Sequence, residues 1–271
     1  MKRIADFAIP SLKIRKNTKN PAPANTSLEF MLDKAQTEQE RDPRFLAKLQ
    51  SALNAGGVHP TAILVVNTLL DLAKHPKYQE KLREEIRQKN VEVSGNWDQH
   101  AFDTLYKLDS ALKESLRFNP ATLTAYSREL LMDCELSSGL RLRKGQLICV
   151  PSCSKQKDEN IFAEPDKYDA LRSYNEDANM HRARPFKSLD EHAHRWGAGR
   201  SACPGRFMAN IIVTVILVRL LDEYDFQLAP SRGRPDSTMT HEFIWLTLGA
   251  RLMVKRRVKN SGIVYGTVAQ I

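Results

Sequence analysis

Cys203 lies in a short stretch, RWGAGRSACPGRF, that contains several small or ring-constrained residues around one thiol. Gly197 and Gly199 permit backbone angles that other residues avoid, so the chain can fold tightly and turn amide groups toward the sulfur. From Arg206 the sequence predicts a buried helix of about five turns, with Pro204 suited to its first turn. A thiol just before a helix N-terminus favours the thiolate, the form that binds metals or attacks electrophiles. The alternative is a small structural cysteine in a loop.

A second group of residues combines one carboxylate with two guanidinium groups. Glu114 and Arg117 are three positions apart in KESLR, on a predicted helix, and therefore share a face. Alone they predict an ordinary surface ion pair. The irregular segment EPDKYDALR supplies a second arginine, Arg172. A carboxylate between two guanidiniums can form bidentate bonds to both, which would lock this loop onto the helix.

The elements that must position these groups are mainly helical. Apolar periodicity and helix-end signals predict helices over 26–36, 42–57, 61–76, 76–88 and 99–120. Two glycines, Gly56 and Gly57, are expected to interrupt the helical pattern between the second and the third. Alternating segments predict strands within 122–151 and near 225–255, and the tail from 233 to 257 predicts a hairpin. Residues 154–200 are expected to be mostly loop, and loops of that length inside a compact domain are usually functional.

Composition narrows the function classes. The chain has 271 residues, 42% of them hydrophobic, and a net charge of +9 that is spread along its length. No helix-turn-helix, RNP or zinc-finger spacing accompanies the basic residues, so we expect no nucleic-acid partner but a basic surface that meets an acidic protein or an anionic membrane. The four cysteines form no CxxC pair, which indicates a reducing compartment and at most one chemically active thiol.

The ends of the chain differ from its centre. Residues 1–26 are expected to form a polar, disordered lead-in without a signal peptide or membrane anchor, because no apolar run there approaches a membrane span. The ordered domain is expected to cover 27–257, and 258–271 to form a frayed tail.

Together, the Glu-x-x-Arg helix, the Pro-to-Arg segment some fifty residues later, and the W-G-x-G-x-x-x-C-P-G loop entering an apolar helix resemble cytochrome P-450, the haem-thiolate monooxygenases. The chain is most similar to filamentous-fungal members, in which a loop ending in GR-x-ACPGRF is typical. The resemblance implies a mainly α (α+β) fold, the C-terminal, haem-binding half of the cytochrome P-450 fold with small β-sheets. It also implies that Glu114, Arg117 and Arg172 form the structural triad that holds the haem-binding loop.

The resemblance assigns haem contacts to the residues around the cysteine. Cys203 matches the axial thiolate of haem b, a ligand that pushes electron density toward the iron and favours O–O cleavage. Trp196 matches the aromatic residue beneath the haem. Arg128 matches an arginine that in many members pairs with a haem propionate; the less favoured alternative is a charge at a strand edge. Ser201 stands where the family has histidine or arginine, so a charge-assisted bond to a propionate is lost and weaker haem retention is expected.

The segment NAGGVHPTA, residues 54–62, resembles the oxygen-binding groove of the family, where a break in the helix leaves room for water. His59 takes the place of a common acid, or it is a helix-kink histidine satisfied by backbone or water. Pro60 takes the place of the expected threonine and has no O–H to relay protons. Thr61 points about 100° away on a regular helix, unless a kink at Pro60 redirects it.

Two functions are therefore carried forward. The first is a haem-dependent monooxygenase that hydroxylates a small apolar molecule, such as a fungal secondary metabolite, with O2 and electrons from an NADPH-dependent reductase. The second is a truncated, non-catalytic remnant that folds poorly or only binds haem, because the resemblance covers only half of a family member. A redox or nucleophilic role for Cys203 is a distant third, since no paired His or Cys supports it. Family members in fungi are usually held on the endoplasmic reticulum by an anchor that this chain lacks, so its localisation stays open between that membrane and the cytoplasm.

Overall fold

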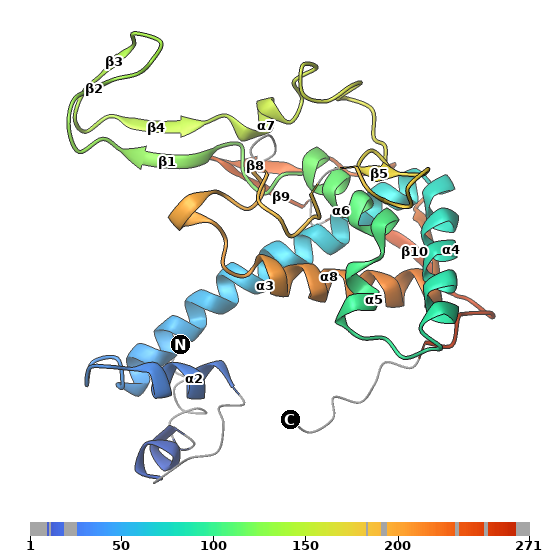
Figure 1. The fold of residues 1–271 in the computed structure, drawn as a ribbon, viewed down its shortest axis with the longest axis horizontal. Coiled ribbons are helices and arrows are strands. Elements are labelled where there is room, and N and C mark those ends of the chain that lie inside the picture. The colour runs from blue at the N-terminus through green and yellow to red at the C-terminus, as the bar shows by residue number, and fades with distance from the viewer. Residues whose placement is uncertain are drawn as a thin grey trace. The chain divides into compact units, whose positions relative to one another are not determined.

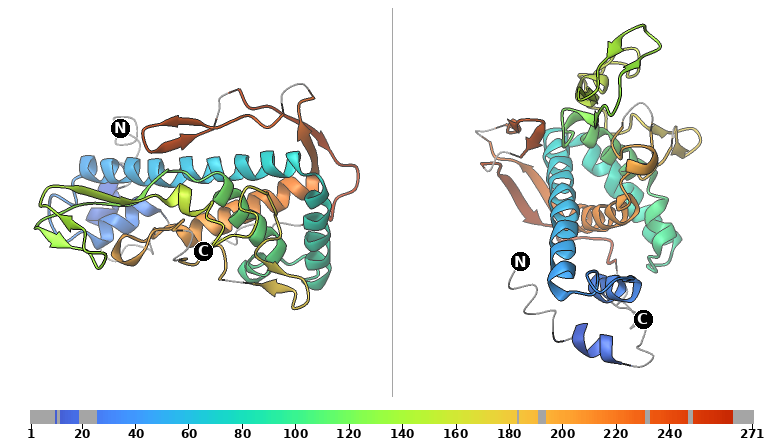
Figure 2. Two further views of the ribbon diagram at one scale, coloured as in Figure 1. Left: turned by 90° about the horizontal axis from the view of Figure 1, so that it is seen from above. Right: turned by 90° about the vertical axis from the view of Figure 1, so that its left-hand side faces the viewer.

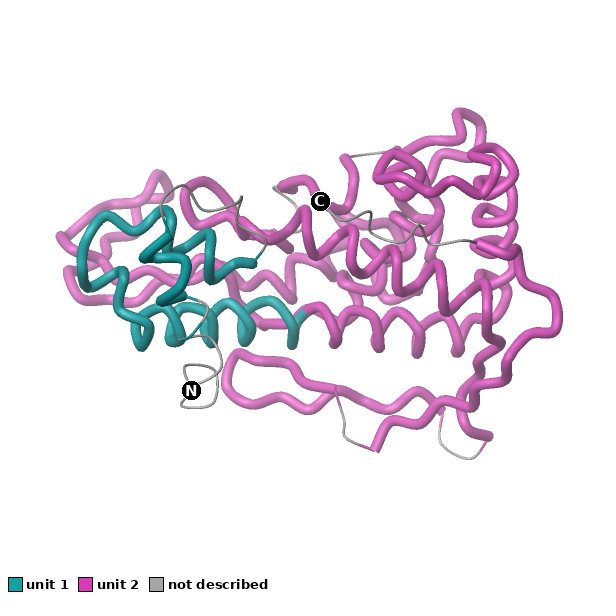
Figure 3. The backbone as a smooth tube through the Cα atoms, turned by 90° about the horizontal axis from the view of Figure 1, so that it is seen from below, with its two compact units in different colours: residues 1–60, 267–271 teal, residues 61–266 magenta. Residues whose placement is uncertain are grey.

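The structure is a computed structural model that describes residues 10, 12–18, 26–182, 184–190, 194–230, 233–246 and 249–263. The chain divides into two compact units, residues 1–60 with 267–271 and residues 61–266 (Figure 3). The boundary falls inside one long helix, α3 (Pro43–Lys74). Each unit is described separately below.

The first unit contains α2 (Ser27–Lys34), which begins where the sequence predicted a helix. Thr26 and Glu29 form a reciprocal capping box, in which each side chain accepts a hydrogen bond from the other residue's backbone N–H. A small apolar cluster of Leu12, Leu32 and Leu46 holds this unit together.

Part of the predicted lead-in is also described. Residues 12–17 are helical, in contrast to the loop expected from residue 15 onward, and Arg15 pairs with Asp33 at 2.6 Å. Most of the remaining lead-in, residues 1–9, 11 and 19–25, lies outside the described residues, as do residues 264–271 of the predicted tail.

The predicted interruption of the long helix is wrong, because α3 runs without a break through Gly56, Gly57 and Pro60. The two glycines have no positive φ and nothing within 4 Å of an added Cβ, so they act here as ordinary, weakly helix-forming residues. By length and composition α3 could cross a membrane, a property that it shares with helices buried in protein cores. Its second half supplies core residues, among them Leu64 and Leu72.

The next helices follow the sequence, with one exception. α4 (Lys77–Glu92) forms as predicted, but the single helix expected over 99–120 is two helices, α5 (Gln99–Asp103) and α6 (Tyr106–Phe118). The break has a tertiary cause, since the Glu85 carboxylate of α4 accepts hydrogen bonds from Lys107 N at 2.7 Å and Leu108 N at 3.0 Å. These N–H groups belong to the first turn of α6, which Glu85 therefore caps from a distance.

The strands form small antiparallel pairs. A ribbon of β1 (Ala125–Glu129) and β4 (Leu147–Val150) carries at its far end the hairpin of β2 (Cys134–Glu135) and β3 (Arg141–Leu142) (Figure 1). Within the long loop region lie α7 (Ser152–Lys155), the pair of β5 (Tyr174–Asn175) and β6 (Met180–His181), and the 3-10 turn η1 (Gly199–Ser201).

The tail contains the predicted hairpin only in part. β8 (Thr238–Thr240) and β9 (Phe243–Trp245) form a hairpin, but β10 (Leu252–Arg256) pairs instead with β7 (Tyr224–Leu228), directly after α8 (Arg206–Glu223). Beyond β10, Ser261 donates hydrogen bonds to Asp222, so the described part of the predicted frayed tail is tied to α8.

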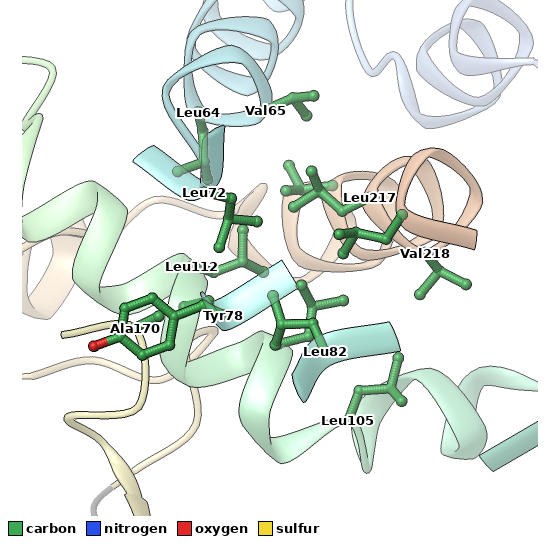
Figure 4. Packing of buried hydrophobic residues seen from close by; sticks show 14 of the residues in the cluster. Leu64, Val65, Leu72, Tyr78, Leu82, Leu105, Leu112, Ala170, Leu217 and Val218 are labelled. Carbon is green, nitrogen blue, oxygen red and sulfur yellow. The ribbon is translucent and has the colours of Figure 1, made fainter. Parts of the chain in front are cut away.

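One hydrophobic core organises the second unit. It joins the second half of α3 with α4, α6 and α8, and Figure 4 shows Leu72, Leu82, Leu112 and Leu217 converging from these four helices. α4 crosses the end of α8, as Figures 1 and 2 both show. The mainly α fold with small antiparallel sheets is confirmed.

Candidate functional site

The cysteine loop is folded on itself by backbone contacts. Cys203 N donates to Trp196 O at 2.7 Å, which closes the segment between them into a compact turn. Gly197, with φ of 72°, is required there, since an added Cβ would lie 2.9 Å from the backbone oxygen of Ser201. The close approach predicted from the glycines is therefore real, and it is made by the backbone of the loop itself.

Cys203 lies three residues before the start of α8 and is partly exposed. Pro204 lies before the helix, not within its first turn as predicted, because Gly205 is the N-cap residue. Arg206 folds back so that its Nη1 donates to Cys203 O at 2.8 Å. The Nε of Arg206 is buried and has no hydrogen-bond partner among the described residues. All four cysteines of the chain are free thiols.

The helix that follows Cys203 is only half buried, in contrast to the buried helix predicted. Its inner face, with Val213, Leu217 and Leu221, lies in the core. The opposite side exposes Met208, Ile212 and Ile216, and Phe207 is exposed in the first turn of the helix. A helix that is apolar on all sides needs cover on all sides. The residues nearest Cys203 thus present an uncovered apolar surface.

Trp196 is anchored under the loop. Its Nε1 donates to Phe186 O at 2.6 Å, and the two rings meet edge to face with centroids 5.1 Å apart. Phe186 is fully buried, and Trp196 packs against the same core. The indole therefore connects the start of the cysteine loop to the core.

Arg128 and Ser201 are brought together by the fold. The side chain of Arg128 extends from β1, and its Nη2 donates a hydrogen bond to Ser201 Oγ at 2.8 Å. The two residues are 73 positions apart in the sequence. Both side chains are exposed, so the guanidinium keeps donors that face away from the serine. Arg128 thus connects β1 to the cysteine loop, and its contact with a haem propionate remains a prediction.

The three-residue cluster predicted from Glu114, Arg117 and Arg172 is assembled. Arg117 Nε and Nη2 each donate to one Glu114 oxygen at 2.9 Å, and Arg172 Nε lies 3.1 Å from both oxygens. The Glu114 side chain is only 2% exposed, so this is a buried ion cluster and not the surface pair that two residues alone would predict. Two cations more than offset the single negative charge of Glu114, and Asp169 N donates a hydrogen bond to the carboxylate as well.

The arginines of the cluster also bind loop backbone. Arg117 Nη1 donates to Gln156 O at 2.7 Å, and Arg172 Nη2 donates to Lys167 O at 2.7 Å. Each carbonyl that they bind lies in the long irregular tract. The cluster therefore fixes the fold of that tract on α6, as the sequence argument expected of it.

His59 and Thr61 lie on α3, one in each compact unit. His59 is exposed and Thr61 is half-buried. Because α3 is continuous, the structure contains no helix break in which they could line a groove, and their catalytic role remains a prediction.

Other polar groups were not predicted from the sequence. Asp71 pairs with Arg234 at 2.6 Å beside a pocket of about 450 Å³ near the end of α3. Burial raises the pKa of Asp71 to about 6, although Arg234 acts to lower it. A second unpredicted cluster joins Tyr126, Lys155 and His194. Asp71 and Arg234 are 163 positions apart and Tyr126 and His194 are 68 apart, so no local pattern could have found either cluster.

The cysteine loop and α8 carry residues of the types that could hold a haem. A partly exposed thiol, an exposed guanidinium and an uncovered apolar helix face lie in one part of the second unit. A thiolate can bind the iron, a guanidinium can pair with a propionate, and an apolar surface can cover the porphyrin. The Nε of Arg206, three residues after the cysteine, is a buried donor with no partner in the part of the chain that the structure describes.

Comparison with known proteins defines the class. The sequence model of the cytochrome P450 family matches residues 1–254. The chain is 33% identical over 264 residues to cytochrome P450 monooxygenase AN1598 of Emericella nidulans, which covers 95% of this chain and 48% of that protein. It is 34% identical to cytochrome P450 monooxygenase penP of Penicillium crustosum, over 85% of this chain and 44% of that protein. The match to terQ of Tolypocladium album is 30%, over 97% and 48%.

This chain belongs to the cytochrome P450 family, and the predicted resemblance is confirmed. It spans about half the length of the curated relatives that it matches. Membership implies a haem cofactor held by a cysteine thiolate, and use of a redox partner and a small-molecule substrate by the family.

Proposed function

We propose that this chain carries the haem-thiolate site of a monooxygenase, with Cys203 as the iron ligand. The observation that supports it best is the position of this thiol. It lies at the end of a loop closed by the Cys203 N to Trp196 O hydrogen bond and next to an uncovered apolar helix face. The similar proteins from Emericella nidulans and Penicillium crustosum are named cytochrome P450 monooxygenases.

In this proposal each residue of the site has a physical task. Cys203 would donate its sulfur to the iron, and Arg128, oriented by Ser201, would hold a propionate by a charge-assisted hydrogen bond. Phe207 and Met208 would shield one side of the porphyrin from water. Trp196 would hold the start of the cysteine loop against the core. Glu114, Arg117 and Arg172 would act at a distance, by fixing the irregular tract before the loop.

When bound, the haem supplies activation of O2, so that two electrons and two protons allow one oxygen atom to enter a substrate C–H bond while the other becomes water. We propose an NADPH-dependent reductase as electron donor, supported by the net charge of +9, which favours an acidic partner surface. The substrate class that we propose is a small apolar metabolite, supported by the fungal origin of the similar proteins.

The test is the carbon monoxide difference spectrum of the reduced full chain, expressed with haem supplied. A red-shifted Soret band is expected in the wild-type protein and in Cys149→Ala, a control that removes another free, exposed thiol. The band is expected to disappear in Cys203→Ala. A spectrum unaffected by Cys203→Ala would overturn the proposed ligand.

The chain spans about half the length of these relatives, so turnover is tested separately from haem binding. Product formation from an apolar substrate, with reductase and NADPH added, would support monooxygenase activity. Thiolate-bound haem without product would limit the proposal to haem binding.

A further inference from the structure

The imidazole of His194 lies between an ammonium group and a phenol. Lys155 Nζ lies 3.1 Å from its Nε2, and Tyr126 Oη lies 3.2 Å from its Nδ1. The rings of Tyr126 and His194 also meet edge to face, with centroids 5.0 Å apart and planes at 88°. The three residues come from β1, from α7 and from the start of the cysteine loop.

The chemistry of the ammonium group sets the tautomer of this histidine. An ammonium can only donate hydrogen bonds, so the Nε2 that faces Lys155 must be the acceptor. A neutral imidazole then carries its proton on Nδ1 and donates it to Tyr126 Oη. Protonation of both nitrogens would place two positive charges 3.1 Å apart.

The backbone around both rings is unusual in the same way. Tyr126 and His194 have φ of 57° and 46°, a left-handed conformation that residues other than glycine rarely adopt. The register of β1 and β4 shifts between Ala125 and Arg128, so Tyr126 sits in an irregularity of the strand. Such irregularities redirect a side chain, here toward the loop.

His194 is connected by short steps to Cys203. Its carbonyl accepts a hydrogen bond from Gly197 N at 3.1 Å, and the adjacent turn ends in the Cys203 N to Trp196 O bond. Arg128, two residues after Tyr126, binds Ser201 near the other end of the loop. Strand β1 thus contacts the loop near both of its ends, through Tyr126 to His194 and through Arg128 to Ser201.

We propose that His194, held by Lys155 as its Nδ1–H tautomer against Tyr126, is a positioning residue that sets the conformation of the Cys203 loop. This inference rests on the proposed function, because a fixed loop conformation matters if the Cys203 sulfur has to be held in place to bind the haem iron. Its geometry can be tested in the chain without haem.

The first measurement is 15N NMR of the histidine rings, which distinguishes the tautomers. The wild-type protein is expected to show His194 with its proton on Nδ1. Lys155→Met removes the donor and is expected to release this preference, whereas Lys155→Arg, which keeps a donor, is expected to preserve it. The matched control is Lys157→Met, which removes an exposed lysine two positions away that pairs only loosely with Asp166, at 3.8 Å.

The second measurement is hydrogen exchange of the Cys203 amide by mass spectrometry of loop peptides. In Lys155→Met, Tyr126→Phe and His194→Leu this amide is expected to exchange on the order of tenfold faster, because each variant removes at least one hydrogen bond that holds His194 and so loosens the loop. Exchange in α4 is expected to remain unchanged, which excludes general unfolding. The His241→Leu control removes another histidine of positive φ from the β8–β9 turn and is expected to leave the loop unaffected.

Two results would overturn the inference: an Nε2–H tautomer in the wild type, or a Lys155→Met protein whose tautomer changes while Cys203 exchange does not. With haem present, the thiolate-type Soret band is expected to weaken in Lys155→Met and to recover in Lys155→Arg. If the wild-type chain takes up no haem, the proposed function fails, while the tautomer and exchange measurements still decide the role of His194.

Discussion

Arg172 donates its Nε–H to both oxygens of Glu114, at 3.1 Å each, although 58 positions separate the two residues in the sequence. Arg172 itself holds loop carbonyls, so the contact ties an irregular tract to a core helix. The tract also places Tyr168, Ala170 and Phe186 in the core, and the polar bonds to Glu114 add to these apolar contacts in fixing its conformation.

Removal of the buried Glu114 carboxylate should therefore lower the free energy of unfolding. Glu114→Gln leaves two guanidiniums in a site with no anion, and we expect the free energy of unfolding to fall by about 3–5 kcal/mol in urea titrations. The control is Arg141→Ala, which breaks an ion pair with Glu135 of similar length, 3.0 Å, in which the arginine side chain is 87% exposed. That change should cost less than about 1 kcal/mol. Equal effects of the two substitutions would contradict a structural role for the cluster.

Stability should depend on the ionisation of Glu85. Burial raises its pKa from 4.5 to about 7, although the backbone N–H groups of Lys107 and Leu108 act to lower it. The folded state therefore binds this proton more tightly than the unfolded state. The contribution is fully present below pH 4.5 and is lost as the pH rises through 7, a change on the order of 3 kcal/mol.

Urea unfolding at several pH values tests this expectation. Glu85→Gln should flatten the decline in stability between pH 4.5 and 7. The control is Glu84→Gln, since the hydrogen bond with Arg87 lowers the pKa of Glu84 and its titration lies below this window. An unchanged slope in Glu85→Gln would show that another group titrates there.

The sequence allowed the Glu114 cluster to be predicted, but not the cap that Glu85 provides. Glu114, Arg117 and Arg172 could be predicted because two of them share a helix face and the third follows in a recognisable segment. The cap that Glu85 places on α6 depends on tertiary contact between helices, so the chain from 99 to 120 reads as one helix until both are packed. In the same way, no periodicity shows that Tyr126 and His194 will adopt left-handed backbone angles and meet.

Gly197 should be the least replaceable glycine of the cysteine loop. An added Cβ would meet Ser201 O at 2.9 Å, and the φ of 72° is itself unfavourable for alanine. Gly197→Ala is expected to lower the free energy of unfolding by about 1–3 kcal/mol and to weaken the thiolate-type Soret band. Gly199→Ala is the matched control, because φ is 54° but nothing lies within 4 Å. The same loss in both variants would mean that backbone angle alone, and not the close approach, limits this loop.

Arg128 should control haem retention if the proposed site is correct. The exposed guanidinium is bound to Ser201, which carries no charge to replace it. Arg128→Leu is expected to accelerate transfer of haem to a scavenger protein by about 10- to 100-fold, the equivalent of one charge-assisted hydrogen bond. Arg141→Leu, an exposed arginine of the distant β2–β3 hairpin, should leave the rate unchanged. Equal rates in Arg128→Leu and the wild type would remove Arg128 from the site.

The continuous α3 makes a prediction opposite to that of the oxygen-binding groove. The groove was expected at a break in the helix, with a kink at Pro60 as the way to redirect Thr61. In the structure α3 is continuous, and Pro60 removes one N–H donor from its interior and crowds the preceding turn. Pro60→Ala should therefore stabilise the helix by up to about 3 kcal/mol, and Gly56→Ala by about 0.5–1 kcal/mol, since an added Cβ there meets nothing within 4 Å. Thermal unfolding followed by far-UV circular dichroism measures both. Loss of stability in Pro60→Ala would instead mean that a kinked form of α3 is the stable one, and would bring Thr61 back as the hydroxyl that relays protons.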